Sequence, residues 1–124
     1  MMKRLFTILL LAVAFNSMLF ADFRPIVIRN GGANGHDHLE QYEPADKPEE
    51  VYYDDDASEI VIVSDGFSAY YDVEINDYST GATVISTQIS GYGDSIDVSS
   101  LSAGTYTITI TTSYNNVFVG QFSI

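Results

Sequence analysis

Two histidines flank a carboxylate in His36-Asp37-His38, and this triplet is the part of the sequence best suited to metal chemistry. Imidazole nitrogens and carboxylate oxygens are ligands that zinc and copper accept. The triplet lies in a polar stretch, and the sequence indicates no third or fourth ligand. We therefore expect solvated loop residues here, with a metal site as the alternative.

A run of three acids, Asp54-Asp55-Asp56, is the second candidate, with Glu49, Glu50 and Glu59 nearby. Carboxylate oxygens are the ligands that calcium prefers. The spacing does not follow the Asp-x-Asp-x-Asp-Gly pattern of a calcium loop. We expect a solvated acidic turn, and we keep calcium as a ligand to be tested.

Catalytic motifs are missing from the sequence. It has no cysteine, no Gly-x-Ser-x-Gly segment and no metalloprotease motif. A pair of carboxylates for glycoside hydrolysis stays open, because their separation cannot be read from sequence. We predict a protein that is not an enzyme and binds no cofactor, with a carboxylate-dependent hydrolase as an alternative.

Tyrosine is the abundant aromatic residue, with nine copies and no tryptophan. Tyrosine is amphipathic and frequent at interfaces, so some of its copies are candidates for a surface that binds a protein or a glycan. For any single tyrosine, an ordinary place in a strand is the simpler expectation. The candidates are Tyr52, Tyr53, Tyr70, Tyr78, Tyr92 and Tyr114.

The N-terminus has the layout of a secretory signal peptide. Basic residues Lys3 and Arg4 precede an apolar run from Leu5 to Phe15, and a small residue, Ala21, ends the segment. The apolar run is short for a membrane span. We predict cleavage after Ala21, with a retained anchor helix as the alternative. The protein is then exported, to the periplasm, the cell surface or the medium, with no membrane span after signal removal.

Removal of 21 of the 124 residues leaves 103, enough for one domain. The remaining part keeps all 17 acids but only Arg24, Arg29 and Lys47, for a formal charge of −14. This charge argues against nucleic acid and anionic membranes as partners. It favours a basic partner or a divalent cation. Without cysteine, stability must come from apolar burial.

The sequence after the signal peptide divides into two parts. Residues 22–50 are predicted to hold one edge strand over Arg24–Arg29, docked loosely, and then a long flexible acidic loop. Residues 51–124 are predicted to form the body of the domain. Together, residues 22–124 make one domain.

The body shows the two-residue periodicity of half-buried strands, broken by turn residues at even spacing. No stretch after residue 22 has helical periodicity. We predict an all-β fold, a single antiparallel immunoglobulin-like β-sandwich of about seven strands. The predicted strands of the body are 51–53, 59–64, 69–76, 82–89, 95–99 and the two strands of a final hairpin.

The final hairpin is the most strongly patterned segment. Tyr106, Ile108 and Ile110 alternate with threonines, which predicts a strand with one buried face. Asn115-Asn116 predicts a two-residue turn. Gly120, in the return strand, indicates a bulge or a close approach of backbones. Tyr106 lies where immunoglobulin-like sandwiches place a tyrosine corner, so its hydroxyl should bond back to the preceding loop.

These features resemble the short secreted Bacteroidetes proteins made of a signal peptide and one immunoglobulin-like β-sandwich of unknown function. The resemblance rests on the signal peptide, the Pro25–Ile28 strand, the Glu59–Ser64 strand and the Leu101-x-x-Gly104-x-Tyr106 hairpin. It implies a domain of unknown function with no catalytic residues to transfer. In that phylum, Asp94-Ser95-Ile96 is similar to an O-glycosylation acceptor, which makes Ser95 a candidate modification site.

The closing hairpin is also similar to the C-terminal sorting domain of the Por secretion system. That domain usually has basic residues near its end, whereas the last 20 residues here contain no Lys or Arg. We predict an exported, non-catalytic binding or structural module of the cell envelope with an unknown protein or glycan partner. A sorting or accessory domain of a Por-type route is the alternative.

Overall fold

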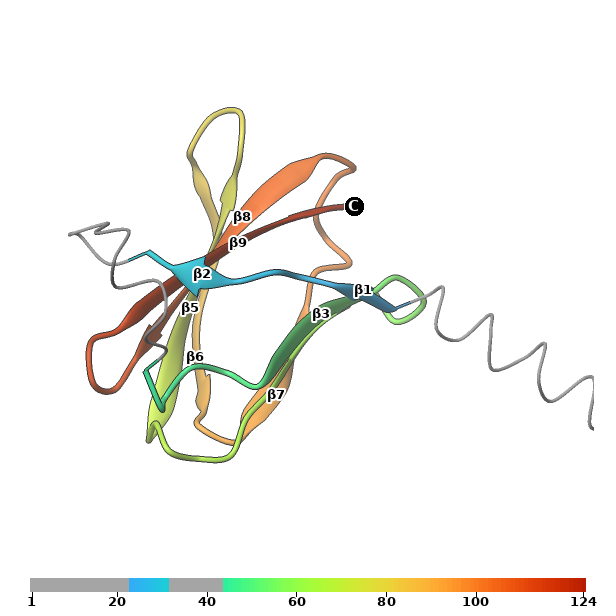
Figure 1. Cartoon of the computed structure of the whole chain (residues 1–124). Helices are drawn as coiled ribbons and strands as arrows, with labels where there is room; N and C mark the ends of the chain where they lie inside the picture. Colours follow the sequence, from blue (N-terminus) through green and yellow to red (C-terminus); the bar gives the residue numbers. More distant parts are fainter. Residues whose placement is uncertain (1–22, 32–43) are drawn as a thin grey trace, which may run out of the picture.

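The computed structural model describes residues 23–31 and 44–124, which form two antiparallel β-sheets packed face to face (Figure 1). The predicted signal peptide and the His36-Asp37-His38 triplet lie outside the described residues. The described strands are β1 (Phe23–Pro25), β2 (Arg29–Asn30), β3 (Glu50–Asp54), β4 (Glu59–Val63), β5 (Tyr70–Asp77), β6 (Thr83–Ser90), β7 (Gly93–Asp97), β8 (Thr105–Thr112) and β9 (Val117–Ser123).

One sheet has four strands in the order β1-β3-β4-β7, and the other has five in the order β2-β9-β8-β5-β6. Every neighbouring pair is antiparallel. The all-β sandwich prediction is confirmed. The seven strands β3–β9 correspond to the seven predicted for the body, and two short strands, β1 and β2, stand where one edge strand over Arg24–Arg29 was predicted.

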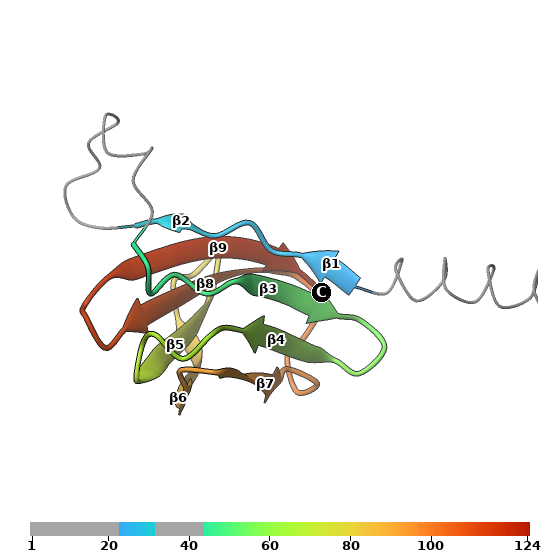
Figure 2. The same cartoon turned by 60° about the horizontal axis from the view of Figure 1, so that its bottom comes forward.

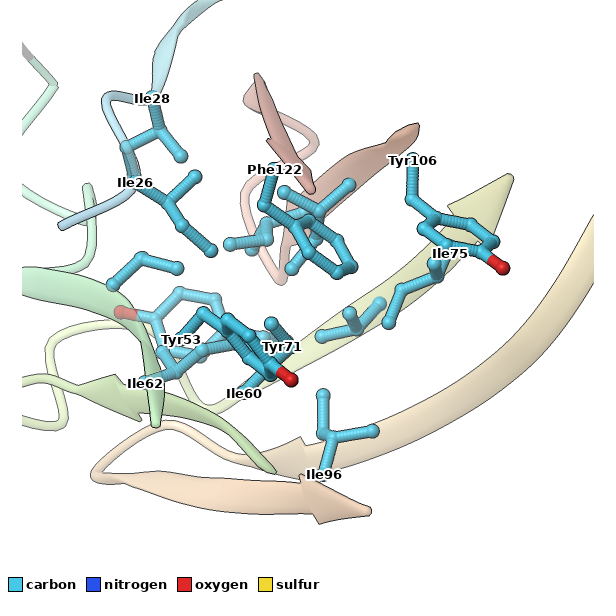
Figure 3. Close-up of a cluster of buried hydrophobic side chains, with 14 of the residues drawn as sticks. Ile26, Ile28, Tyr53, Ile60, Ile62, Tyr71, Ile75, Ile96, Tyr106 and Phe122 are labelled. Atoms are coloured by element: carbon cyan, nitrogen blue, oxygen red, sulfur yellow. The ribbon is translucent and has the colours of Figure 1, made fainter. Parts of the chain in front are cut away.

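The core lies between the sheets and follows the predicted alternation. In β8, Tyr106, Ile108 and Ile110 are buried, while the intervening threonines lie on the outer face and stay partly exposed. β5 repeats the pattern with Tyr71, Val73 and Ile75. Side chains on a strand alternate between its faces, so each sheet supplies one apolar face to a shared core (Figure 3).

The N-terminal segment differs from the prediction of one loosely docked edge strand. β1 pairs with β3 in the first sheet, and β2 pairs with β9 in the second. Between them, Ile26 and Ile28 are buried, at 6% and 8% exposure, and point toward Phe122 (Figure 3). The prediction of loose docking is therefore wrong, because two isoleucines of the same parity fill the space where the chain crosses from sheet to sheet.

Gly120 makes room for this crossing segment. A Cβ atom at Gly120 would lie 2.8 Å from Cγ2 of Ile26 and 3.0 Å from the carbonyl oxygen of Val27. These separations are shorter than van der Waals contact allows. The prediction of a close backbone approach at Gly120 is confirmed.

The closing hairpin turns where predicted but through a longer loop. The Asn115 N–H donates to the carbonyl oxygen of Thr112 (2.9 Å), and the Thr112 N–H donates to that of Asn116 (2.9 Å). Asn115 has a φ of 66°. This pattern is a three-residue loop with one left-handed residue, so the predicted two-residue turn at Asn115-Asn116 is wrong.

Two contacts close the opposite end of the sandwich. The Tyr106 hydroxyl donates a 2.6 Å hydrogen bond to the carbonyl oxygen of Ser102, which confirms the predicted tyrosine corner. Ile124 and Gly104 exchange backbone hydrogen bonds of 2.9 and 3.1 Å. The last residue of the chain is thus held by the β7–β8 connection, and its side chain packs against the core.

Candidate recognition surface

The acidic run proposed for calcium forms the β3–β4 turn. One carboxylate oxygen of Asp54 accepts the N–H groups of Asp56 and Ala57, both at 3.1 Å. Asp55 forms a 3.1 Å ion pair with Arg24 of β1, and both side chains are about half exposed. Among the described residues, no three His, Asp or Glu side chains gather in a metal-binding arrangement. Calcium stays a ligand to be tested, and the side chain of Asp54 closes the turn.

Asp55 and Arg24 also act on Tyr53, which is buried in the core. The Tyr53 hydroxyl donates to Asp55 at 3.4 Å, and the Arg24 guanidinium lies 5.8 Å from the centre of the tyrosine ring. Burial, together with the negative charge of Asp55, raises the pKa of Tyr53 above 10.0. The phenol therefore stays neutral, and the three side chains join β1 to β3.

Like Asp54, the side chains of Asp77 and Asp97 accept hydrogen bonds within turns. Asp77, at the end of β5, accepts the hydroxyl of Ser79 (2.7 Å) and the N–H groups of Ser79 and Thr80 (2.9 and 3.2 Å). These hydrogen bonds lower the pKa of Asp77 below its usual 3.8. Hydrogen bonds from Ser99 likewise lower the pKa of Asp97. Both carboxylates are caps of turns, a local role that aspartate favours.

A buried carboxylate that the sequence reasoning treated as part of the flexible loop anchors the segment entering β3. Asp46 is 2% exposed and accepts the hydroxyl of Thr112. The side-chain amide of Asn116 donates to both of its oxygens, at 3.0 Å each. A buried charge needs such partners, so Asp46 ties residues 44–49 to the β8–β9 hairpin.

The same polar cluster extends into the core. The Tyr71 hydroxyl donates to the carbonyl oxygen of Asp46 (3.2 Å) and shares a 2.6 Å hydrogen bond with Ser64. Burial raises the pKa of Tyr71 above 10.0, partly offset by the Ser64 hydrogen bond. No buried side-chain polar atom lacks a partner within the described part of the chain. The cluster is fully satisfied, and we assign it to stability rather than to chemistry.

Three large aromatic side chains are exposed at the end of the sandwich that carries the β8–β9 turn. Phe67, Tyr92 and Tyr114 are 53%, 73% and 60% exposed. The rings of Phe67 and Tyr114 lie 5.5 Å apart, and the Tyr92 ring lies against Gly66, the neighbour of Phe67. We call these three residues the aromatic end. They come from the β4–β5, β6–β7 and β8–β9 connections, so the surface exists only in the folded chain.

Sequence reasoning found only part of this surface. Tyr92 and Tyr114 were among the candidate tyrosines, whereas Phe67 was missed. Tyr53 is buried instead, and Tyr78 is exposed at the opposite end of the sandwich. The turn signal Asp65-Gly66 before Phe67 marks an aromatic residue placed in a loop, and this signal was available in the sequence.

The opposite end carries both ends of the described domain. β1 and the C-terminus lie together there, whereas the β8–β9 turn and the β4–β5 connection lie at the far side (Figure 2). A groove of about 500 Å³ opens beside β1 and the end of β9, with Arg24, Tyr53, Tyr78 and Phe122 among its lining residues. The aromatic end is therefore remote from β1 and from Ile124 (Figure 2).

Ser95, the candidate acceptor for O-glycosylation, lies exposed on the edge strand β7. Its N–H donates to the side chain of Asp94 at 2.8 Å. The hydroxyl is thus accessible, and the modification stays a prediction. In the described part of the chain, no helix has the length and apolar character needed to cross a membrane.

A solved structure of another protein has the same fold. A crystal structure of a DUF3244 family protein with an immunoglobulin-like β-sandwich fold, from Bacteroides vulgatus ATCC 8482, aligns with a TM-score of 0.62. The alignment covers 82% of this chain and 98% of that chain at 14% identity, which shows the immunoglobulin-like fold. The search of curated proteins found no match.

The family model of the secretion system C-terminal sorting domain matches residues 56–122, which is 67 of the 124 residues. The match runs from the β3–β4 turn to the end of β9 and so includes strands of both sheets. This family indicates an exported protein. The chain belongs to the family of secretion system C-terminal sorting domains.

Proposed function

We propose that this β-sandwich is a non-catalytic sorting module, which a secretion apparatus of the outer membrane recognises as a folded domain. The observation that carries the proposal is the family match over residues 56–122. In this function, the sandwich is a binding module, and its partner is a protein of the export route.

Recognition of the folded state is supported by how the matched segment is built. Its strands belong to both sheets, and β4 pairs with β7 and β5 with β8, so residues far apart in sequence become neighbours only after folding. Ile124 exchanges two backbone hydrogen bonds with Gly104, so the end of the matched segment is built into the sandwich. A receptor therefore meets a surface formed by loops and strands.

We propose the aromatic end as the surface that this receptor contacts. Exposed clusters of large apolar rings are uncommon on monomeric proteins and often mark interaction sites. Aromatic residues are also enriched in the centres of interfaces. The position of the aromatic end supports this role, because β1 and Ile124 lie at the opposite end (Figure 2), so a protein fused ahead of residue 22 would leave the aromatic end uncovered.

The negative charge of the body favours a receptor with a basic surface. No lysine or arginine occurs after Lys47, whereas the body from residue 51 onward carries ten acids. A receptor with basic residues around an apolar contact would be attracted and oriented by this charge. Nucleic acid would be repelled.

The experiment places a fluorescent reporter between the signal peptide and residue 22 and expresses the fusion in a Bacteroidetes host. The host is used with and without its Por-type secretion system, and the periplasm, cell surface and medium are assayed for the reporter. The proposal predicts reporter outside the outer membrane only when the system is present. Reporter that stays in the periplasm of both strains would contradict sorting and favour a resident binding or structural module of the envelope.

A further inference from the structure

The free edge of β6 differs from the other sheet edges of the described structure. The sheet orders place β1, β7, β2 and β6 at edges. β1 has three residues and includes Arg24 and Pro25, and β2 has two residues. β7 carries Asp94 and Asp97. Short length, charge and proline are devices that keep sheet edges from pairing with other chains.

β6 lacks these three devices. It is eight residues long, its sequence Thr-Val-Ile-Ser-Thr-Gln-Ile-Ser has no charge and no proline, and most of its side chains are exposed. A register shift sits only at its start, opposite Ile75 and Asn76. Apart from its ladder to β5, Thr83–Ser90 forms no backbone hydrogen bond with the rest of the described chain. About half of its backbone groups therefore face outward without a partner.

We infer that β6 accepts an extended, basic segment of a partner protein as a sixth strand of its sheet. Backbone hydrogen bonds along a free edge supply affinity in this mode of recognition, and side chains supply specificity. This inference does not depend on the proposed sorting function.

The carboxylates beside β6 select the basic segment. Asp72 and Glu74 lie on the outer face of β5, where Asp72 accepts a 3.0 Å hydrogen bond from Gln88 and Glu74 a 3.3 Å hydrogen bond from Thr83. An added strand would lie about 4.8 Å beyond β6. Lysine or arginine side chains on its outer face, opposite Ser86 and Gln88, would reach toward these two acids.

A second copy of this chain is a poorer occupant. Pairing β6 with β6 would bring together two sheets that each carry Asp72 and Glu74 close to the junction, at separations where salt screens only part of the repulsion. The formal charge of −12 on each full chain adds to this cost.

The test uses the chain purified after export and an eight-residue peptide of alternating lysine and valine. Amide hydrogen exchange and chemical shifts are recorded during titration, with two comparison peptides. One replaces lysine by glutamate, and the other is N-methylated at every residue so that it donates no backbone hydrogen bond along either edge. We expect slowed exchange and shifts in β6 with the lysine peptide, and at least about fivefold weaker binding of both comparison peptides.

Two exposed glutamines on the same sheet give matched variants. Gln88→Lys places a positive charge on β6 and should weaken binding of the lysine peptide about fivefold. Gln121→Lys makes the same change on β9, three strands away, and should change binding less than twofold. Equal binding of the N-methylated peptide, shifts confined to other strands, or equal effects of the two variants would overturn the inference. A dimer in sedimentation, with β6 amides protected, would overturn the choice of occupant.

Discussion

The hydroxyl of Tyr106 donates a 2.6 Å hydrogen bond to the carbonyl oxygen of Ser102, four residues earlier in the chain. The tyrosine ring is 3% exposed and stacks on Phe122 at 5.7 Å between ring centres. The β7–β8 connection is thereby fixed to the start of β8, next to the last residues of the chain.

Tyr106→Phe keeps the ring and removes only the hydroxyl. It should lower the free energy of unfolding by about 1 kcal/mol, because one hydrogen bond to a carbonyl is lost. Chemical denaturation monitored by circular dichroism measures this change. Tyr78→Phe, at an exposed tyrosine at the same end, is the matched control and should have no measurable effect. Equal stability of both variants would contradict the role of the corner.

Asp46→Ala should destabilise the protein by about 3 kcal/mol, because it leaves the Thr112 hydroxyl and the Asn116 amide without their buried acceptor. Glu49→Ala, an exposed acid three residues away, should change stability by less than about 0.5 kcal/mol. In an Asn116→Ala background the Asp46→Ala change should cost less, since the two side chains are coupled. Additive costs in this double-mutant cycle would contradict the coupling.

The pH dependence of the melting temperature of Asp77→Ala tests whether the Asp77 carboxylate stabilises the turn after β5. The lowered pKa of Asp77 means that its carboxylate stabilises the fold at pH above about 3.8, and this contribution is lost as pH falls through the folded-state pKa. The melting temperature of the variant should lie below that of the original chain at pH 7, and the difference should shrink toward pH 2.5. Asp56→Ala removes a charge in another turn and serves as the control. A difference that is constant with pH would contradict the assignment.

Gly120→Ala should destabilise the sandwich by about 1–3 kcal/mol, since the added methyl would lie 2.8 Å from the Ile26 side chain and 3.0 Å from the Val27 carbonyl oxygen. Thermal denaturation measures the loss. Gln121→Ala changes an exposed neighbour and should leave the melting temperature nearly unchanged. If Gly120→Ala melts like the original chain, the crossing segment is not packed as described.

The regular strands were predictable because their side chains follow a period of two. Tyr106, Ile108 and Ile110 alternate with threonines, and one buried face follows directly from that pattern. The same alternation in Ile26 and Ile28 was visible, but periodicity does not say which sheet a strand joins. The alternation therefore could not predict that β1 and β2 pair in different sheets.

Turn length and long-range polar pairing were harder to predict. Asn115 marks the turn in both a two-residue and a three-residue loop, and only the pairing of Thr111 with Val117 decides between them. Nothing in the sequence distinguishes Asp46 from the other acids of its segment, because its partners Thr112 and Asn116 are more than 60 residues away. The aromatic end joins three separate connections, and no local signal links them.

The most direct test of the sorting proposal is the export of a variant without the aromatic end. Phe67→Ser, Tyr92→Ser and Tyr114→Ser are combined in the reporter fusion, and the reporter outside the outer membrane is measured in the strain with an intact secretion system. We expect this variant to be folded, by its circular dichroism and melting curve, and to accumulate in the periplasm. Export of this folded variant at the level of the original chain would contradict the aromatic end as the recognised surface.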